Sequence, residues 1–387
     1  MRQTEDVMLP ASLKHLAKLL APAVRGPVGL RGSVEPELVK LAIYRHQVGP
    51  LLHAALQGSG MAISDELLVE LSECRLRSAN RHAEDLARLQ RIGAILAAHR
   101  LSWMVLKGTP QAARLYGDPA LRPSSDIDLL VEPRDFERAV SALAERGYIP
   151  SNPPAPAGPI RTLVLAAVRD VSLIAEDDHK SAVDLHRRLF LAVGRRPNGL
   201  HLSRDPGPLP TPRVNADLAC YLIMHGAQSY WVRLKWLLDL VPLLAILEEQ
   251  EKHALISRAR QIGVENSVIA SLALLRLLFP FAKFGPLAPW LEAHQRRPAV
   301  RERLERYVRM IGMERDWKHS PLDNARVTMQ AYWALFEAPL TRARMIPVAL
   351  LSSAIRRTAG AIWRAERALT RDDTPPPDQA QAGLPTR

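Results

Sequence analysis

The chain has 387 residues, of which 47% are hydrophobic and 24% charged, and its formal net charge is +12. This composition fits a globular, mostly helical protein of two or three domain-sized units, and excludes a transmembrane or disulfide-rich chain. The positive charge, carried mostly by arginine, is compatible with nucleic acid, an acidic lipid surface or an anionic nucleotide. Without interleaved aromatic residues, it does not favour a dedicated polynucleotide groove.

Residues 1–97 are expected to form an N-terminal helical region. Apolar side chains recur at three- and four-residue spacing over 35–55 and 64–98, which is the period of an amphipathic helix. Pro36 and Ser64 are suited to the starts of these helices, since proline fits the first turn and serine caps free amide groups.

The segment 98–194 is predicted to contain a small mixed sheet. The expected elements are a strand at 103–106, a helix at 111–115, a strand beginning at 126, a helix at 135–146 closed by Gly147, and several strands that end near 184. The acidic residues 176–179 lie between two apolar alternating runs and are expected to form a solvated hairpin loop.

Two carboxylates lie two positions apart in the second of these strands, Asp126 and Asp128. Because residues i and i+2 of a strand point to the same face, the two side chains project together. At about 5 Å and an effective dielectric of about 20 they repel by roughly 3 kcal/mol, which a divalent cation between them offsets. The pattern predicts a Mg²⁺ or Mn²⁺ site for a nucleoside triphosphate (NTP).

The turn Lys107-Gly108-Thr109 lies between the first strand and the following helix. Such a turn offers backbone amide groups and a helix N-terminus to phosphate oxygens. Lys107 adds a cation, and Gly108 permits a backbone conformation that other residues reach only with strain. We predict that these three residues bind phosphate groups of the NTP.

A Pro/Gly-rich linker is expected over 195–214, followed by a C-terminal helical domain over 215–370 and a disordered tail over 371–387. Within that domain, 340–371 alternates apolar runs with arginines. Such a segment is either a basic amphipathic helix lying on an anionic membrane or, as we favour, a helix packed on the domain with its arginines in water.

The order of these motifs resembles an uncharacterised bacterial family of nucleotidyltransferases in the DNA polymerase β-like superfamily. The resemblance is carried by LKG at 106–108, LYGDPALRP at 115–123, SDIDLLV at 125–131, VDLH at 183–186 and RLKWLLD at 233–239. It covers about residues 95–280. It implies an α+β fold in which a small mixed-sheet polymerase-β-like core is flanked by N- and C-terminal helical domains.

The resemblance also implies an activity and further site residues. The activity is metal-dependent transfer of a nucleoside monophosphate from an NTP to an acceptor hydroxyl, with release of pyrophosphate. Asp184 would join Asp126 and Asp128 as a catalytic, metal-binding carboxylate. Ser125 would contact the nucleotide, and Arg122 would either bind phosphate or act as a structural clamp.

Three further polar residues are expected to have supporting roles. His186 shares the face of Asp184, and a hydrogen bond to a carboxylate is favoured over direct metal binding. Lys235 and Asp239 are four apart on a helix and are expected to form an internal ion pair, the alternative being that Lys235 reaches the nucleotide. His225, on an apolar helix, is expected to be a core or supporting residue and no metal ligand.

The fold does not determine the acceptor, which could be a small molecule, a protein side chain or an RNA end. Two functions other than an enzyme remain open. One is a non-catalytic nucleotide- or partner-binding module, and the other is a toxin- or antitoxin-like component. The presence of all three carboxylates favours the enzyme, because a core that had lost its activity would be expected to lose at least one.

The expected location is the cytoplasm. Cys74 and Cys220 are far apart and fit a reducing compartment. The N-terminal sequence lacks the continuous apolar core of a signal peptide. The longest apolar candidate for a transmembrane segment, 236–247, contains Asp239 and is shorter than the roughly 20 residues that a span requires.

Overall fold

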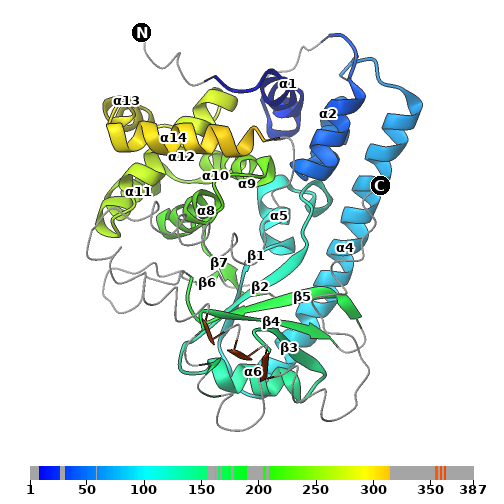
Figure 1. Cartoon of the computed structure of the whole chain (residues 1–387), viewed down its shortest axis with the longest axis vertical. Coiled ribbons are helices and arrows are strands. Elements are labelled where there is room, and N and C mark those ends of the chain that lie inside the picture. Colours follow the sequence, from blue (N-terminus) through cyan, green and yellow to red (C-terminus); the bar gives the residue numbers. More distant parts are fainter. Residues whose placement is uncertain are drawn as a thin grey trace.

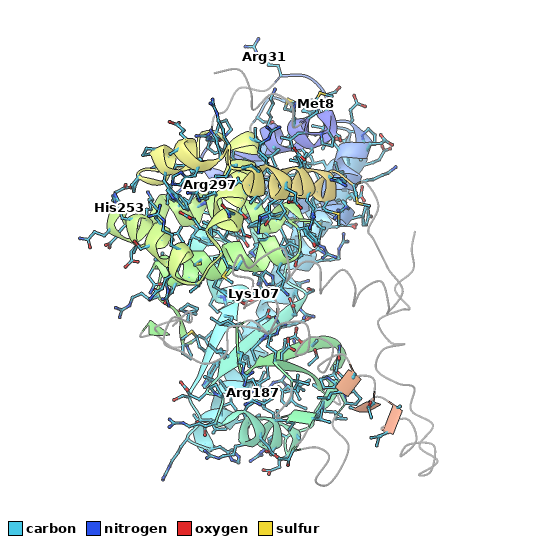
Figure 2. All side chains as sticks on the ribbon, turned by 60° about the vertical axis from the view of Figure 1, so that its left-hand side comes forward. Met8, Arg31, Lys107, Arg187, His253 and Arg297 are labelled. Atoms are coloured by element: carbon cyan, nitrogen blue, oxygen red, sulfur yellow. The ribbon has the colours of Figure 1, made fainter. Side chains whose placement is uncertain are left out.

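The computed structural model has a sheet at one end and a layer of helices at the other, with a long helix running beside both (Figure 1). Lys107 lies where the two ends meet (Figure 2). The structure describes residues 8–313 except 27–30, 58, 155–161, 163, 166–167, 176–177, 190–203 and 206–208, and in addition 354–355, 358–359 and 361–362.

Five strands form one mixed sheet in the order β1-β2-β5-β4-β3. β2 and β5 run parallel, and the other neighbouring pairs run antiparallel. The strands are β1 (Trp103–Lys107), β2 (Asp126–Val131), β3 (Tyr148–Asn152), β4 (Asp170–Ala175) and β5 (Asp178–His186). The predicted α+β class with a small mixed sheet is confirmed. Of the expected hairpin loop at 176–179, the first two residues lie outside the described part, and the last two belong to β5.

Three short helical elements connect the first strands: α5 (Thr109–Tyr116), the 3-10 helix η3 (Pro119–Leu121) and α6 (Phe136–Ala144). The predicted helix over 135–146 is thus present, and Gly147, with a φ of 81°, follows it as expected. Phe136, Val140 and Leu143 recur at helical spacing and are buried against the sheet and the C-terminal half of the long helix.

The N-terminal region is helical as predicted, but the expected helix over 35–55 is divided. The elements are α1 (Ala11–Leu20), the 3-10 helix η1 (Ala21–Val24), α2 (Pro36–Lys40), the π-helix η2 (Leu41–Arg45), α3 (Gly49–Leu56) and α4 (Asp65–Ala98). The break before α3 follows from a left-handed φ of 54° at Gln47 and from Pro50, which cannot continue a preceding helix. The long helix α4 begins as predicted, with the Ser64 side chain accepting a hydrogen bond from the Leu67 amide.

The predicted linker over 195–214 contains regular structure in its described part. β6 (Arg204–Asp205) and β7 (Thr211–Pro212) form a short antiparallel pair. The amide of Val105 in β1 donates to the carbonyl of Pro210 at 2.8 Å. This segment therefore lies along the edge of the sheet, where it pairs with backbone groups that an edge strand would otherwise expose.

Seven helices follow within residues 216–311. They are α8 (Ala216–Gln228), α9 (Leu234–Leu238), α10 (Leu240–Ile246), α11 (Glu249–Gln261), α12 (Glu265–Leu278), α13 (Leu287–His294) and α14 (Pro298–Ile311). They share one hydrophobic core with the N-terminal helices, in which Leu16 and Leu52 pack in the same cluster as Ile223 and Leu272. The helices that precede the sheet in the sequence and those that follow it thus form one layer (Figure 1).

Part of the predicted C-terminal domain lies outside the described residues. One such part is the segment 340–371, for which a helix on a membrane surface was the alternative. The structure describes only residues 354–355, 358–359 and 361–362 of it. Ala359 is buried in the hydrophobic core that contains the sheet residues. The expected tail at 371–387 falls wholly outside. Among the residues that the structure does describe, no helix is long and apolar enough to cross a membrane.

A buried ion pair joins the sheet unit to the helices. Arg122 precedes β2, and its Nε lies 2.9 and 2.8 Å from the two carboxylate oxygens of Asp239, between α9 and α10. The Arg122 Nη2 adds a contact of 2.8 Å, and the Tyr116 hydroxyl donates to the same carboxylate at 2.9 Å. Both charges are thereby satisfied although the side chains are only 6% and 4% exposed.

Breaking this ion pair is expected to destabilise the protein strongly. Asp239→Ala leaves a buried guanidinium without a counter-ion, so the free energy of unfolding should fall by about 3–5 kcal/mol. Urea unfolding measures the change. Glu292→Ala is the matched control, because it removes the 66%-exposed partner of Arg276, and an exposed pair contributes less than about 1 kcal/mol. Equal losses in the two variants would contradict the prediction.

Candidate active site

Four strands bring polar residues into one row across the sheet. Asp128 of β2 lies opposite Asp184 of β5, and Ser172 of β4 lies opposite Asp184 on the other side. Lys107 of β1 pairs with Asp128, because an irregularity just before Lys107 shifts the register by one residue. Without that shift the partner of Asp128 would be Leu106, whose side chain belongs to the core.

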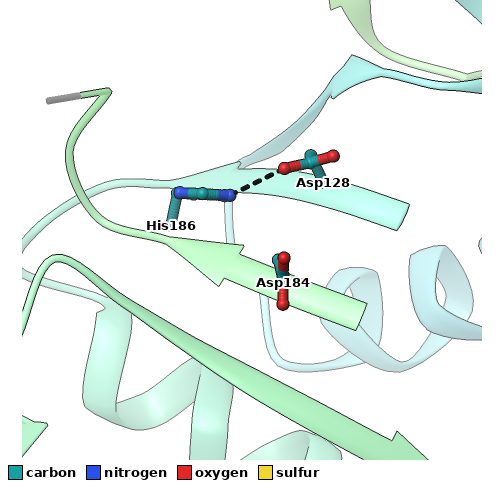
Figure 3. Close-up of side chains that lie close together, drawn as sticks. All are labelled: Asp128, Asp184 and His186. Atoms are coloured by element: carbon teal, nitrogen blue, oxygen red, sulfur yellow. Dashed lines mark hydrogen bonds and ion pairs between the residues drawn. The ribbon is translucent and has the colours of Figure 1, made fainter. Parts of the chain in front are cut away.

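Asp128 has a neighbouring basic side chain at each carboxylate oxygen, and it is 3% exposed. Lys107 Nζ lies 3.1 Å from its Oδ2, and His186 Nε2 lies 3.0 Å from its Oδ1 (Figure 3). Burial opposes ionisation of this carboxyl, but Lys107 and the hydrogen bond from His186 outweigh burial and hold the pKa of Asp128 well below its usual range. Asp128 is therefore a carboxylate at neutral pH, balanced by the ammonium group of Lys107.

Asp184 has the opposite electrostatic character. Burial and the neighbouring charge of Asp128 raise its pKa to about 6. The Ser172 hydroxyl donates to its Oδ1 at 2.6 Å, which partly offsets that shift. The two adjacent carboxyls thus differ in charge state below neutral pH, because Lys107 stands beside only one of them.

Asp128, Asp184 and His186 form a group that fits a divalent cation. Each offers one ligand atom, and these atoms lie within 4.8 Å of one another. Carboxylate oxygens suit Mg²⁺ and Mn²⁺, and an imidazole nitrogen suits borderline cations. The predicted set was Asp126, Asp128 and Asp184, so the structure keeps two of its members together and adds His186. For His186 we favoured a hydrogen bond to a carboxylate over direct metal binding, and that hydrogen bond, to Asp128, is present.

Asp126 lies outside this compact group but borders the same cavity. It is on the same face of β2 as Asp128, and its partner on β5 is Ala182. The side chain is partly exposed, and the exposed Ser125 donates to its Oδ1 at 3.2 Å. Asp126 therefore stands at the rim of the row, and the nucleotide contact expected of Ser125 stays a prediction.

A cavity of about 190 Å³ lies over the row. Its walls are formed by Lys107, Asp126, Asp128, Arg169, Asp170, Asp184, His186, Leu189, Tyr221, His225, Gln228 and Ser229. Helix α8 supplies the wall opposite the sheet through Tyr221, His225 and Gln228. We did not identify Tyr221 or Gln228 from the sequence, although their i, i+4, i+7 spacing with His225 is the signal of one helical face.

His225 and Asp170 extend the polar network. Burial lowers the pKa of His225 well below its usual value, so its neutral ring accepts a hydrogen bond from Lys107 Nζ at 3.3 Å. Asp170 lies opposite His186 in the β4–β5 ladder and is paired with Arg169. Its position two residues before Ser172 places both on one strand face, a signal that the sequence contains and that we did not use.

His82 of α4 holds the turn Lys107-Gly108-Thr109 in place. Gly108 has a φ of 100°, and an added Cβ would lie 3.7 Å from the nearest atom, Ser124 Oγ, so conformation and not crowding requires glycine here. The Thr109 hydroxyl lies 2.6 Å from His82 Nδ1, and His82 Nε2 lies 2.8 Å from the carbonyl of Arg122. A carbonyl only accepts, and burial lowers the pKa of His82. The neutral ring therefore donates through Nε2 and accepts from Thr109 through Nδ1.

Arg122 and Lys235 hold the backbone around the site. Arg122 is in the buried ion pair with Asp239, a geometry that favours the structural clamp over the phosphate-binding alternative. The predicted Lys235–Asp239 ion pair is wrong: Lys235 Nζ donates to the carbonyl of Pro123 at 3.2 Å. Burial, with the charge of Arg122, lowers the pKa of Lys235 to about 7. Arg122 makes three contacts to Asp239 through two nitrogens of a rigid plane, and so occupies this carboxylate more completely than a lysine would.

The raised pKa of Asp184 predicts that its charge destabilises the metal-free protein. Its pKa is about 6 in the folded protein against 3.8 for a free carboxyl. As pH rises, the unfolded chain ionises first, so this group's contribution to stability falls between about pH 4 and pH 6. Asp184→Asn removes the charge and keeps an oxygen for Ser172. In EDTA it should be more stable than wild type by about 3 kcal/mol at pH 8 and nearly equal at pH 4.

Urea unfolding of both proteins across this pH range tests the prediction. An advantage of Asp184→Asn that did not change with pH would come from packing and would contradict an ionisation effect.

Comparison with known proteins agrees with the motifs in the site. A family described as "Uncharacterised nucleotidyltransferase" matches residues 33–280, which include the whole sheet, α4 and α8. Neither the curated proteins nor the solved structures contain a match. The family match covers more than half of the chain, and the chain therefore belongs to this family of nucleotidyltransferases.

Proposed function

We propose that the protein transfers a nucleoside monophosphate from an NTP to an acceptor hydroxyl and releases pyrophosphate. One observation carries the proposal: two parallel strands place Asp128 beside Asp184, and Asp126 borders the same cavity. This is the arrangement of acidic groups that metal-assisted phosphoryl transfer requires. Membership of the family supports the reaction class.

The residues around the cavity divide into three roles. Asp128 and Asp184, with Asp126 at the rim, would hold a divalent cation, Mg²⁺ or Mn²⁺, which when bound neutralises the charge on the phosphates and polarises the α-phosphorus. Asp184 would accept the proton of the attacking hydroxyl. Lys107, with the amide groups that follow Gly108, would face the departing β- and γ-phosphates from the end of β1.

Label transfer tests the proposal directly. Protein incubated with Mn²⁺ or Mg²⁺ and each NTP labelled at the α-phosphate should move label to itself or to a component of a cell extract, and should release pyrophosphate. EDTA should abolish both NTP binding and transfer. Asp184→Ala should lower turnover by several orders of magnitude, because it removes the proton acceptor, and should change NTP affinity by less than about tenfold, or about 1.4 kcal/mol.

Binding and transfer are measured separately so that the alternatives are distinguished. The double variant Asp126→Asn, Asp128→Asn should lose metal-dependent NTP binding in calorimetry. Metal-dependent binding without transfer to any acceptor would favour a non-catalytic nucleotide- or partner-binding module, or a toxin- or antitoxin-like component. Equal NTP affinity in EDTA and in Mg²⁺ would contradict the proposed site.

The turn at Gly108 gives an independent prediction for phosphate binding. Its φ of 100° is a conformation that costs other residues about 1–3 kcal/mol. Gly108→Ala should therefore shift the amide groups and weaken NTP binding by about tenfold or more, although the added Cβ meets no close neighbour. Thr109→Ser keeps the hydroxyl that donates to His82 and should bind NTP as wild type does. Calorimetry with Mn²⁺ and NTP measures both. Normal binding by Gly108→Ala would make the turn purely structural.

A further inference from the structure

We infer that His186 is a direct metal ligand whose ring is oriented by Asp170. The inference rests on the proposed metal-dependent function and adds a nitrogen ligand to a site otherwise built from carboxylates. It also assigns Asp170, which the motif of the resemblance does not include, as the positioning residue behind that ligand. The evidence is the position of the two ring nitrogens of His186.

The ring of His186 spans the space between two acidic groups. Its Nε2 lies 3.0 Å from Asp128 Oδ1, and the residue belongs to the group of three possible metal ligands with Asp128 and Asp184. Its Nδ1 lies 3.6 Å from Asp170 Oδ2. The side chain is 8% exposed, so both nitrogens face protein groups. The β4–β5 register, which places Asp170 directly opposite His186, creates this geometry.

The Nδ1 atom is buried and has no hydrogen-bond partner among the described residues. A buried polar atom without a partner has an energetic cost, so its persistence requires an explanation. A neutral ring carries one proton, and the hydrogen bond that it donates to the carboxylate of Asp128 places this proton on Nε2. That tautomer leaves Nδ1 as an acceptor facing a carboxylate, which has no proton to give.

The other tautomer removes this mismatch. When Nε2 uses its lone pair to bind a cation, the ring proton is on Nδ1, which then points at Asp170 Oδ2. A histidine that binds a metal through one nitrogen and donates to a carboxylate through the other is the usual arrangement at metal sites. Arg169 pairs with Asp170 and holds that carboxylate in place. The unpartnered nitrogen is therefore a feature that cation binding would satisfy.

The ligand set also selects among cations. Mg²⁺ prefers oxygen ligands, whereas Mn²⁺ accepts carboxylate oxygen and binds nitrogen more readily. A site made of Asp128, Asp184 and His186 should thus bind Mn²⁺ more tightly than Mg²⁺. If His186 only hydrogen-bonded Asp128, its replacement by another donor would leave that preference unchanged.

Pulsed electron paramagnetic resonance of Mn²⁺ added to the full-length protein tests the inference without turnover. Wild type should show modulation from a directly bound ¹⁴N nucleus, and labelling histidine alone with ¹⁵N should change it. His186→Gln, which retains an amide donor for Asp128, should abolish the modulation. His225→Gln, which replaces the other histidine of the cavity, should retain it.

Calorimetry provides the second readout. His186→Gln should lose more affinity for Mn²⁺ than for Mg²⁺, and Asp170→Asn should weaken Mn²⁺ binding by about 10–100-fold. Mn²⁺ bound by wild type without nitrogen modulation would overturn the inference while leaving nucleotidyl transfer, measured by label transfer, intact. Absence of Mn²⁺ binding by the wild-type protein would overturn both. The wild-type spectrum decides the question even if a variant fails to fold.

Discussion

The parallel pairing of β2 with β5 sets two carboxylates, Asp128 and Asp184, opposite each other, and the surrounding structure compensates for their repulsion. The compensation is unequal. An ion pair with Lys107 serves one carboxylate, and a hydroxyl of Ser172 serves the other. Since an ammonium group stabilises a carboxylate more than a hydroxyl does, the pKa of Asp128 falls while that of Asp184 rises. The site therefore combines one carboxylate that is charged at neutral pH with one whose charge responds to pH, and both offer oxygens to the proposed cation.

The helices outside the sheet are part of this site. Three backbone carbonyls of the loop before β2 are held from α4 and α9: that of Arg122 by His82, that of Pro123 by Lys235, and that of Ser125 by Arg81. Each contact fixes a carbonyl, so it restrains the backbone whatever the loop side chains do. The position of Asp126, the next residue, depends on these contacts. The helices therefore do more than cover the sheet, because they fix the loop that positions Asp126 at the cavity.

Local patterns were sufficient to predict β1, β2 and a group of strands ending near Asp184, together with the glycine turn and the shared face of Asp126 and Asp128, because a period of two and a helix start are properties of neighbouring residues. They did not predict β6 and β7, which lie in the expected linker. Contacts between distant segments were not predictable in this way. The pairing of Lys107 with Asp128 depends on an irregularity in β1. The position of Asp170 behind His186 depends on the register of an antiparallel pair. The expected Lys235–Asp239 ion pair failed for the same reason: spacing along one helix identifies residues that can meet, but a stronger partner arrives from another part of the fold.

The shared core of the first and last helices has a consequence for how the chain folds. In sequence the sheet lies between two groups of helices whose side chains pack in one cluster, so the sheet is in effect an insertion within a helical unit. During synthesis the sheet can form before α8 to α14 have emerged, whereas α1 to α3 must wait for those later helices to complete their core. The loop before β2 is held by α4 on one side and α9 on the other, so it gains its last restraint only then. The geometry of the proposed active site is consequently expected to be among the last features of the molecule to form, after all three carboxylates have already been synthesised.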